Sequence, residues 1–455
     1  MKVFFPLIEF YPISYIGDLG ITINKLVEQL LAKNQEIIIS LPLYKSTDLS
    51  NYNYQTILSV EILGLDCEVL KCTTDKLTIY FIKNYEFFSR ENIYGYHDDI
   101  YRFAFYCRAV IEVIKIIGKI DLIHICDWHT SFLPLLIEIY KIKIDIILNI
   151  FDLKFQGLTS KQILYFLDIK EDYYHSGLLE YYDGVNILKS GLILSNTVTF
   201  NSKTYFENIL KNEMKAYGLN GLIKVIESKC IPVSHGIDEY FNPDTDNLIS
   251  SRYSTFDLSG KTECKTVLQK DLSLPVHTEI PLLVIPSLFV SEDEIWLLNS
   301  IIPYLIRMEI QIVILGNKLA DFEKNINELS FRLNCSVTSI EDNEENIRKV
   351  FSAADIILDV SQEALNDKLV KIALAYGVLP IVMNESPDID IESNKFRIFN
   401  FTSDDLINTI KYTINKYYHM DKWDEKVKEV MNYDFSWSKT ADKYLEIYSK
   451  ILNKN

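Results

Sequence analysis

One stretch of sequence, DLIHICDWHTSFLPLL at residues 121–136, constrains the fold of this chain more than any other. Residues 121–125 predict a short buried strand, and a polar turn at 126–129 leads to Thr130 or Ser131, either of which can cap a following helix. In an open α/β sheet, ligands bind beyond the carboxyl ends of the strands, where helix N-termini offer free amides. We therefore expect Asp127 and His129 to lie where a pocket forms.

The alternation of strand, loop and helix recurs in both halves of the chain. In the first half the pattern predicts a strand at 2–8, a helix near 21–33, and strands at 36–42 and 144–150. In the second half it predicts strands at 281–290, 311–316 and 380–383, with a helix at 294–306. We expect an α/β protein of two doubly wound, Rossmann-like domains.

Loop-forming residues suggest where these domains begin and end. Pro, Gly, Asp and Ser are frequent in the region that follows residue 231. We expect a first domain at 1–245, a linker at 246–275, a second domain at 276–430, and a C-terminal helix within 431–455 that crosses back to the first domain.

Composition limits the classes of function. A chain of 455 residues, 48% of them hydrophobic, can bury two cores, and its net charge of −17 argues against nucleic acid or an anionic membrane as a partner. The seven scattered cysteines form no C-x-x-C pair, which favours a reducing cytoplasm. No cluster has metal-ligand spacing, and the N-terminus is expected to form a buried strand and not a signal peptide. We therefore expect a cytoplasmic protein without a metal or other cofactor.

Several segments resemble one known family. Residues 121–130 resemble the "DVVHxHDWHT" segment of bacterial glycogen synthases and plant starch synthases, and EFYPISYIGDLGIT at 9–22 resembles their "EFYPLVKTGGLADV". The segments at 83–110 and 434–452 resemble further family motifs, so the likeness extends in order over nearly the whole chain. It implies the glycosyltransferase B fold, in which two domains face a cleft, and glucosyl transfer from ADP-glucose to an α-1,4-glucan.

Positions that bind the donor in this family are replaced here. The Lys of "KTGGL" falls on Tyr15 and its second glycine on Asp18, while the Arg and Lys of "GRLxxQKG" fall on Ser287 and Glu292. A pyrophosphate needs basic side chains, glycine-backed amides and helix N-termini. We expect this divergent site to repel the donor.

Other family positions are also changed. The family's sugar-binding His falls on Phe151, and the Glu of "EPCGL" falls on Ala364, although a one-residue shift would restore it as Glu363. The remaining changes are an Asp replaced by Ile21, an Asn replaced by His235, a glycine amide lost at Pro286, and the "TGGL" glycines lost in 385–388.

The residues retained belong to the wall that faces the glucan and part of the sugar in the family: Glu9, Tyr94, Asp127, His129 and Gly236. Each also has a structural interpretation. Asp127 and His129 can brace the turn, Glu9 can pair with a loop amide, His235 can be a solvated loop residue, and the acidic run 292–294 can be a solvated helix start.

Two hypotheses follow. In the first, the chain is a family member that has lost donor binding and acts without catalysis, as an α-glucan- or oligosaccharide-binding module or as a regulator of a catalytically active synthase. In the second, it is an active retaining glucosyltransferase, using ADP-glucose or another donor, with a rebuilt site. The second needs a new basic cluster, for which Lys154, Lys203 and Lys371 are the candidates.

Overall fold

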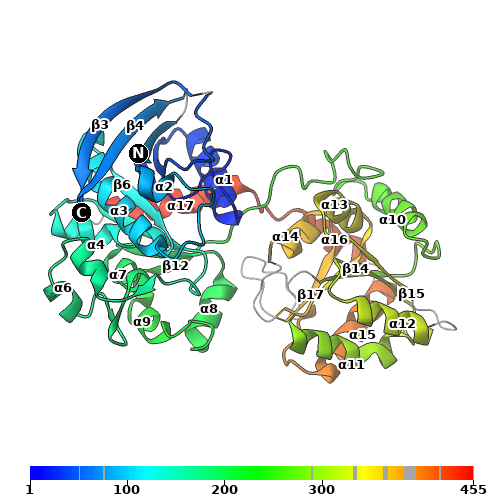
Figure 1. Cartoon of the computed structure of the whole chain (residues 1–455). Helices are drawn as coiled ribbons and strands as arrows, with labels where there is room; N and C mark the ends of the chain where they lie inside the picture. The colour runs from blue at the N-terminus through cyan, green and yellow to red at the C-terminus, as the bar shows by residue number, and fades with distance from the viewer. Residues whose placement is uncertain are drawn as a thin grey trace. The chain divides into compact units, whose positions relative to one another are not determined.

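The computed structural model describes residues 1–50, 52–74, 77–287, 291–330, 336–361, 367–383, 396–419 and 422–453. The chain forms two compact units (Figure 1): Met1–Ser234 together with Thr440–Asn455, and His235–Lys439. Each unit has its own apolar core. None of the helices within the described ranges has the length and apolar character that a membrane crossing requires.

The first unit is built on a nine-stranded sheet in the order β12-β11-β7-β6-β1-β2-β5-β4-β3. Its strands are β1 (Lys2–Pro6), β2 (Glu36–Pro42), β3 (Tyr54–Ile62), β4 (Leu65–Thr73), β5 (Thr78–Lys83), β6 (Leu122–Cys126), β7 (Asp145–Ile150), β11 (Thr197–Phe200) and β12 (Cys230–Pro232). The central strands pair in parallel and are apolar on both faces, as a sheet covered by helices requires.

The antiparallel hairpin β3–β4 extends this sheet beyond β5. A second, small sheet contains β8 (Leu158–Thr159), β10 (Gly184–Asn186) and β9 (Glu180–Tyr181) in that order. The helices of the unit are α1 (Asp18–Ala32), α2 (Tyr85–Phe88), α3 (Asp99–Ile117), α4 (Leu133–Ile139), α5 (Gln162–Phe166), α6 (Asp172–His175), α7 (Ile187–Leu194), α8 (Lys203–Lys211) and α9 (Asn220–Val225), with 3-10 turns η1 (Trp128–Thr130) and η2 (Glu227–Lys229).

The order of the strands in the first unit reverses at β1. From β1 the chain proceeds to β2 on one side and later returns to β6 on the other. Such a switch point leaves a crevice at the carboxyl ends of the two strands, where ligands bind in open α/β sheets. The loop after β1 carries Glu9, and the turn after β6 carries Asp127 and His129.

The second unit contains a five-stranded parallel sheet in the order β15-β14-β13-β16-β17. Its strands are β13 (Leu282–Pro286), β14 (Gln311–Leu315), β15 (Ser336–Ile340), β16 (Ile356–Asp359) and β17 (Leu379–Val382). Its helices are α10 (Ser259–Asp271), α11 (Glu292–Leu305), α12 (Ala320–Ser330), α13 (Glu344–Ala353), α14 (Asp367–Ala375), α15 (Ser403–His419) and α16 (Trp423–Met431). Helices α11, α12 and α15 cover one face of the sheet, and α13, α14 and α16 cover the other (Figure 1).

The expected linker at 246–275 is not a separate segment. It lies within the second unit, because α10 packs on α13 and the Lys265 ammonium bonds to the Asp355 carboxylate at 2.6 Å. Tyr253 and Leu268 from the same region belong to the core of this unit. The first unit accordingly ends at Ser234 and not at residue 245.

The C-terminal helix α17 (Trp437–Leu452) belongs to the first unit from Thr440 onward. Figure 1 shows it, in red, beside elements of that unit. The Tyr448 hydroxyl lies 2.8 Å from Nδ1 of the buried His124 on β6, and Lys33 pairs with Asp442 at 2.7 Å. Burial lowers the pKa of His124 to about 3, so the imidazole is neutral in this contact.

The buried Arg102 on α3 fixes the loop that precedes this helix. Its guanidinium donates to the carbonyls of Phe87 at 2.8 Å and Ile93 at 3.0 Å, pairs with Asp99, and is fully buried. The residue that follows Ile93 is Tyr94, one of the candidate site residues. Arg102 thereby links the core of the first unit to the site.

We predict that Arg102→Leu destabilises the first unit by about 3–5 kcal/mol, because it leaves the buried carbonyls of Phe87 and Ile93 without this donor and removes the fully buried partner of Asp99. Arg108→Leu on the same helix is the control. Its pair with Glu112 is partly exposed, so its loss should cost about 1 kcal/mol or less. Urea unfolding followed by circular dichroism measures both changes; equal losses in the two variants would contradict this role of Arg102.

Candidate functional site

The site of the first unit is a chain of contacts around the Glu9 carboxylate. Glu9 is buried, and its Oε1 accepts a hydrogen bond from the Tyr94 hydroxyl at 2.8 Å. Its Oε2 accepts from the amides of Ile16 at 2.9 Å and Gly17 at 3.3 Å. These are the amides of the loop that leads into α1. A carboxylate of the protein itself therefore occupies donors that a bound anion would otherwise use.

Tyr94 also connects Glu9 to the turn after β6. Its ring lies 5.2 Å from the His129 ring, centroid to centroid. Burial lowers the pKa of His129 to about 3, so this side chain is a neutral imidazole beside the tyrosine. Burial, followed by the nearby Glu9 charge, raises the pKa of the Tyr94 hydroxyl, which stays protonated and donates to Glu9.

Asp127 has an unusual backbone conformation. Its φ of 49° and ψ of −166° lie in a region that residues other than glycine rarely adopt. The carboxylate is buried, and Oδ1 accepts from the amides of Phe151 at 2.7 Å and Asp152 at 3.5 Å. Burial raises the pKa of Asp127 to about 7, while these two amides act against the shift. Asp127 thus links the turn after β6 to the loop after β7.

Other predicted positions of the first unit stay outside this chain of contacts. Tyr15 is exposed, and its ring meets the edge of Tyr11 with centroids 4.8 Å apart. Asp18 is exposed in the first turn of α1, where its charge suits the helix dipole. Neither position therefore offers a positive charge to a ligand.

In the second unit, backbone amides at the start of α11 form hydrogen bonds with side chains of the same segment. Ser291 and Glu294 form a capping box: the Glu294 amide donates to Ser291 Oγ at 3.4 Å, and the Ser291 amide donates to the Glu294 carboxylate at 2.8 Å. Glu292 and Asp293 add exposed carboxylates to the first turn of α11. This N-terminus therefore carries three acidic side chains.

Ser287 is fully buried at the end of β13. Its hydroxyl donates to the Leu315 carbonyl at 3.2 Å and accepts from the Lys318 amide at 3.3 Å. A Cβ on Gly316 would lie 2.5 Å from Ser287 Oγ, so the β14 loop is packed directly against the serine. The surroundings of Ser287 leave no room for an arginine side chain without repacking.

Gly236 and His235 lie in the second unit, and each packs against Trp437. A Cβ on Gly236 would lie 2.5 Å from the Trp437 amide nitrogen, and the His235 ring stacks on the indole at 5.5 Å. Burial and the neighbouring Lys371 lower the pKa of His235 to about 3. His235 was expected to be a solvated loop residue, but it is only partly exposed, because one face of its ring stacks on the tryptophan.

The three lysines considered for a rebuilt site do not form one cluster. Lys371 is buried, pairs with Asp367 at 2.8 Å and donates to the His235 carbonyl. Lys203 on α8 pairs with Glu207 at 3.7 Å, and the Lys154 ammonium lies 5.7 Å from the Phe155 ring. Lys371 belongs to the second unit and the other two to the first.

Lys318 is a candidate functional residue that was not predicted from the sequence. This exposed lysine follows β14, and its amide bonds to Ser287, so it lies at the carboxyl edge of the sheet of the second unit. A glycine directly after an apolar strand, as at Gly316, is the signal that marks this loop.

Within the described ranges, no group of three or more His, Cys, Asp or Glu side chains is placed to hold a metal ion. Ala364, Glu363 and 385–388 lie outside the described residues.

The two units are each built on a largely parallel sheet with helices on both faces, which is the architecture of the B-type glycosyltransferase fold. A family model described as the starch synthase catalytic domain matches residues 2–225. A glycogen synthase of Caldicellulosiruptor bescii is 32% identical over 480 residues, and one of Clostridium novyi is 30% identical over 479 residues, with 100% of this chain and of each relative covered. The chain therefore belongs to the glycogen synthase and starch synthase family.

Solved structures show the same fold. The catalytic domain of starch synthase IV from Arabidopsis thaliana, bound to ADP and acarbose, matches with a TM-score of 0.73 at 24% identity and covers 99% of both chains. Sucrose-phosphate synthase from Thermosynechococcus elongatus matches with a TM-score of 0.55 at 12% identity, over 100% of this chain and 99% of that one.

The raised pKa of Asp127 gives a pH prediction. A carboxyl whose pKa is higher in the folded chain stabilises the fold at low pH, and this contribution disappears as pH rises through its folded pKa of about 7. We expect the unfolding free energy of the wild type, relative to Asp127→Asn, to fall by up to about 4 kcal/mol between about pH 4 and about pH 7.5. Urea titrations of both proteins measure this difference. A difference that stays flat or rises with pH would show that Asp127 is ionised throughout.

Proposed function

We propose that this member of the glycogen synthase family has lost, or retains only severely impaired, glucosyl transfer from ADP-glucose, and that it acts as a glucan-binding or regulatory protein. One observation carries the proposal. The amides of Ile16 and Gly17 before α1 bond to Glu9, and at the start of α11 the amides of Ser291 and Glu294 each bond to the other residue's side chain. A donor diphosphate that binds at either place has to compete with a carboxylate of the protein.

Charge supports the same conclusion. The positions that carry Lys or Arg in the family motifs are Tyr15, Ser287 and Glu292 here, and Asp18 adds a further carboxylate. Hydrogen bonds to charged groups contribute roughly 1.5–3 kcal/mol each, and the loss of one preorganised stabilising group slows catalysis by about 10²–10³-fold. Losses at several positions together leave the rate of transfer close to that without enzyme.

The residues that remain favour binding of a neutral sugar. Tyr94 and His129 are partly exposed rings at the switch point of the first unit, and the imidazole is neutral. Sugars stack on aromatic rings and bond to carboxylates, and both kinds of group are present around Asp127. We propose that an α-glucan segment binds at Tyr94, Asp127 and His129.

A regulatory role on the glucan polymer follows from binding without catalysis. A protein that binds glucan without extending it can hold a catalytically active synthase on the same polymer or compete with it. We place this function in the cytoplasm, in keeping with the free thiols of the six described cysteines, five of which are buried.

The alternative is an active transferase with a rebuilt donor site. Lys318 is the observation in its favour, because it lies next to Ser287 at the edge where the donor binds in the family. Against it, Lys371 and Lys203 are each paired with an acidic side chain. A single exposed lysine replaces little of the missing charge.

We predict that the purified chain transfers glucose from radiolabelled ADP-glucose to glycogen at least about 10³-fold more slowly than the Caldicellulosiruptor bescii synthase under the same conditions. Any residual transfer should be unchanged in Lys318→Ala. Transfer within about tenfold of the relative's rate would contradict the proposal, and its loss in Lys318→Ala would establish the rebuilt site instead.

A further inference from the structure

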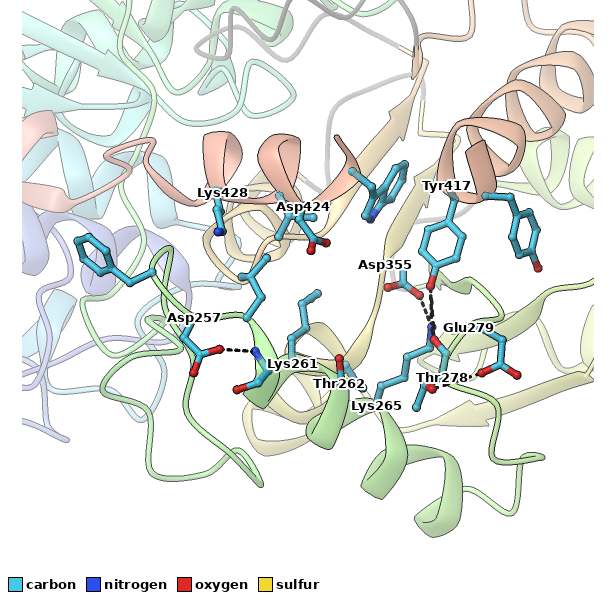
Figure 2. A pocket seen from close by; sticks show the side chains of 17 residues that line it. Asp257, Lys261, Thr262, Lys265, Thr278, Glu279, Asp355, Tyr417, Asp424 and Lys428 are labelled. Atoms are coloured by element: carbon cyan, nitrogen blue, oxygen red, sulfur yellow. Dashed lines mark hydrogen bonds and ion pairs between the residues drawn. The ribbon is translucent and has the colours of Figure 1, made fainter. Parts of the chain in front are cut away.

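A pocket of about 740 Å³ lies wholly within the second unit, between α10 and α16. Its volume is in the range of small-molecule sites in proteins, roughly 300–1,000 Å³. Figure 2 shows Asp424 and Lys428 of α16 across from Lys261, Thr262 and Lys265 of α10. The candidate site described above does not include this pocket.

Two lysines of α10 line the pocket, and both are buried. Lys265 is fully engaged: its ammonium contacts Asp355 and the carbonyls of Thr278 and Ile280 at 2.6–2.8 Å. Lys261 has no such acidic contact, and its ammonium donates to the Tyr376 carbonyl at 2.9 Å and the Phe351 carbonyl at 3.4 Å. An ammonium has three N–H donors, and these two contacts account for two of them.

The charges around the pocket nearly cancel. Lys265 and Asp355 neutralise each other by direct contact. The other charged lining residues are Lys261, Lys428, Asp257, Glu279 and Asp424. This balance provides no excess of positive charge for a phosphate and no convergent carboxylates for a cation. It suits a neutral ligand that both donates and accepts hydrogen bonds.

Aromatic side chains complete the lining. Phe256 is 96% exposed, an unusual state for a large apolar ring, and Tyr418 is 42% exposed. Trp423 is nearly buried and holds Tyr417 edge-on with ring centroids 5.1 Å apart. Exposed rings next to hydroxyl, carboxylate and ammonium groups match the alternating apolar and hydroxylated surfaces of a sugar ring.

We propose that this pocket is a binding site for a neutral oligosaccharide, with Phe256 and Tyr418 as stacking surfaces and Lys261, Asp257 and Asp424 as hydrogen-bonding groups. The class of ligand follows from the pocket. Its identification as an α-glucan rests on the proposed function. With a site in each unit, the chain contacts a glucan polymer at two places, which strengthens its attachment without any catalytic step.

The test uses maltoheptaose as the probe and the full chain in calorimetric titration. Thr262→Trp fills the pocket from an exposed helical position, and we expect it to remove the binding event assigned to this site. Phe256→Ala removes one stacking surface and should weaken the same event about tenfold. Glu263→Trp, on the same helix but outside the lining, and Phe399→Ala, at another exposed phenylalanine of this unit, are the matched controls and should leave binding within about twofold.

Asp127→Ala in the first unit separates the two sites. If maltoheptaose still binds to Asp127→Ala and binding is then lost on adding Thr262→Trp, the pocket is a sugar site. If Thr262→Trp binds maltoheptaose as the wild type does, or if the wild type shows no binding at all, the pocket proposal is overturned. Binding of inorganic phosphate that Thr262→Trp abolishes would overturn it too. These titrations measure binding only. The proposed loss of catalysis is tested separately, by the transfer of glucose from ADP-glucose.

Discussion

The first N–H groups of an α-helix have no partner within the helix, and something else must accept their hydrogen bonds. In a transferase that uses a nucleotide-sugar, a bound diphosphate can fill this role. In this chain, side chains of the protein accept such hydrogen bonds. Ser291 and Glu294 close the start of α11, and Glu9 holds the loop amides before α1. The proposed loss of donor binding depends on the capping box of α11 together with the missing basic side chains, because Glu9 is a residue that the family retains.

The supporting scaffold is intact. Arg102 ties α3 to the loop before Tyr94, and Asp127 ties the turn after β6 to the loop after β7. Asp127 keeps a backbone conformation that costs on the order of 1–3 kcal/mol. Such strain persists only where surrounding contacts enforce it, and in this chain it lies at the switch point of the sheet. The change from the family pattern is therefore concentrated in donor-side residues and not in the fold.

Much of the fold could be predicted from the sequence, because apolar runs separated by polar turns mark buried parallel strands. The predicted strand at 36–42 coincides with β2, and the strand expected at 311–316 is β14 with one residue fewer. The hairpin β3–β4 was missed because its turn residues, Leu63 and Gly64, both have positive φ, and a leucine gives no signal for that conformation. The linker was misplaced for two reasons. Loop-forming residues precede α10, and the buried face of α10 includes Lys261 and Lys265, which do not look like core residues in the sequence.

The candidate site was harder to predict. The motifs indicated Glu9, Tyr94, Asp127 and His129, and the structure connects Glu9 to Tyr94 and Tyr94 to His129. The sequence could not show that the Glu9 carboxylate occupies the Ile16 and Gly17 amides, since that contact depends on how the loop folds back. It also gave no sign of the pocket beside α10, because its lining comes from segments between residues 256 and 428.

The most direct test of this account is a crystal structure of the full chain grown with a high concentration of ADP. We predict no diphosphate at Gly17 or at the start of α11, with Ser291 and Glu294 still bonded to each other and Glu9 still on the loop amides. A diphosphate bound to those amides, with the capping box open and Glu9 displaced, would contradict the account and show that the donor site remains functional.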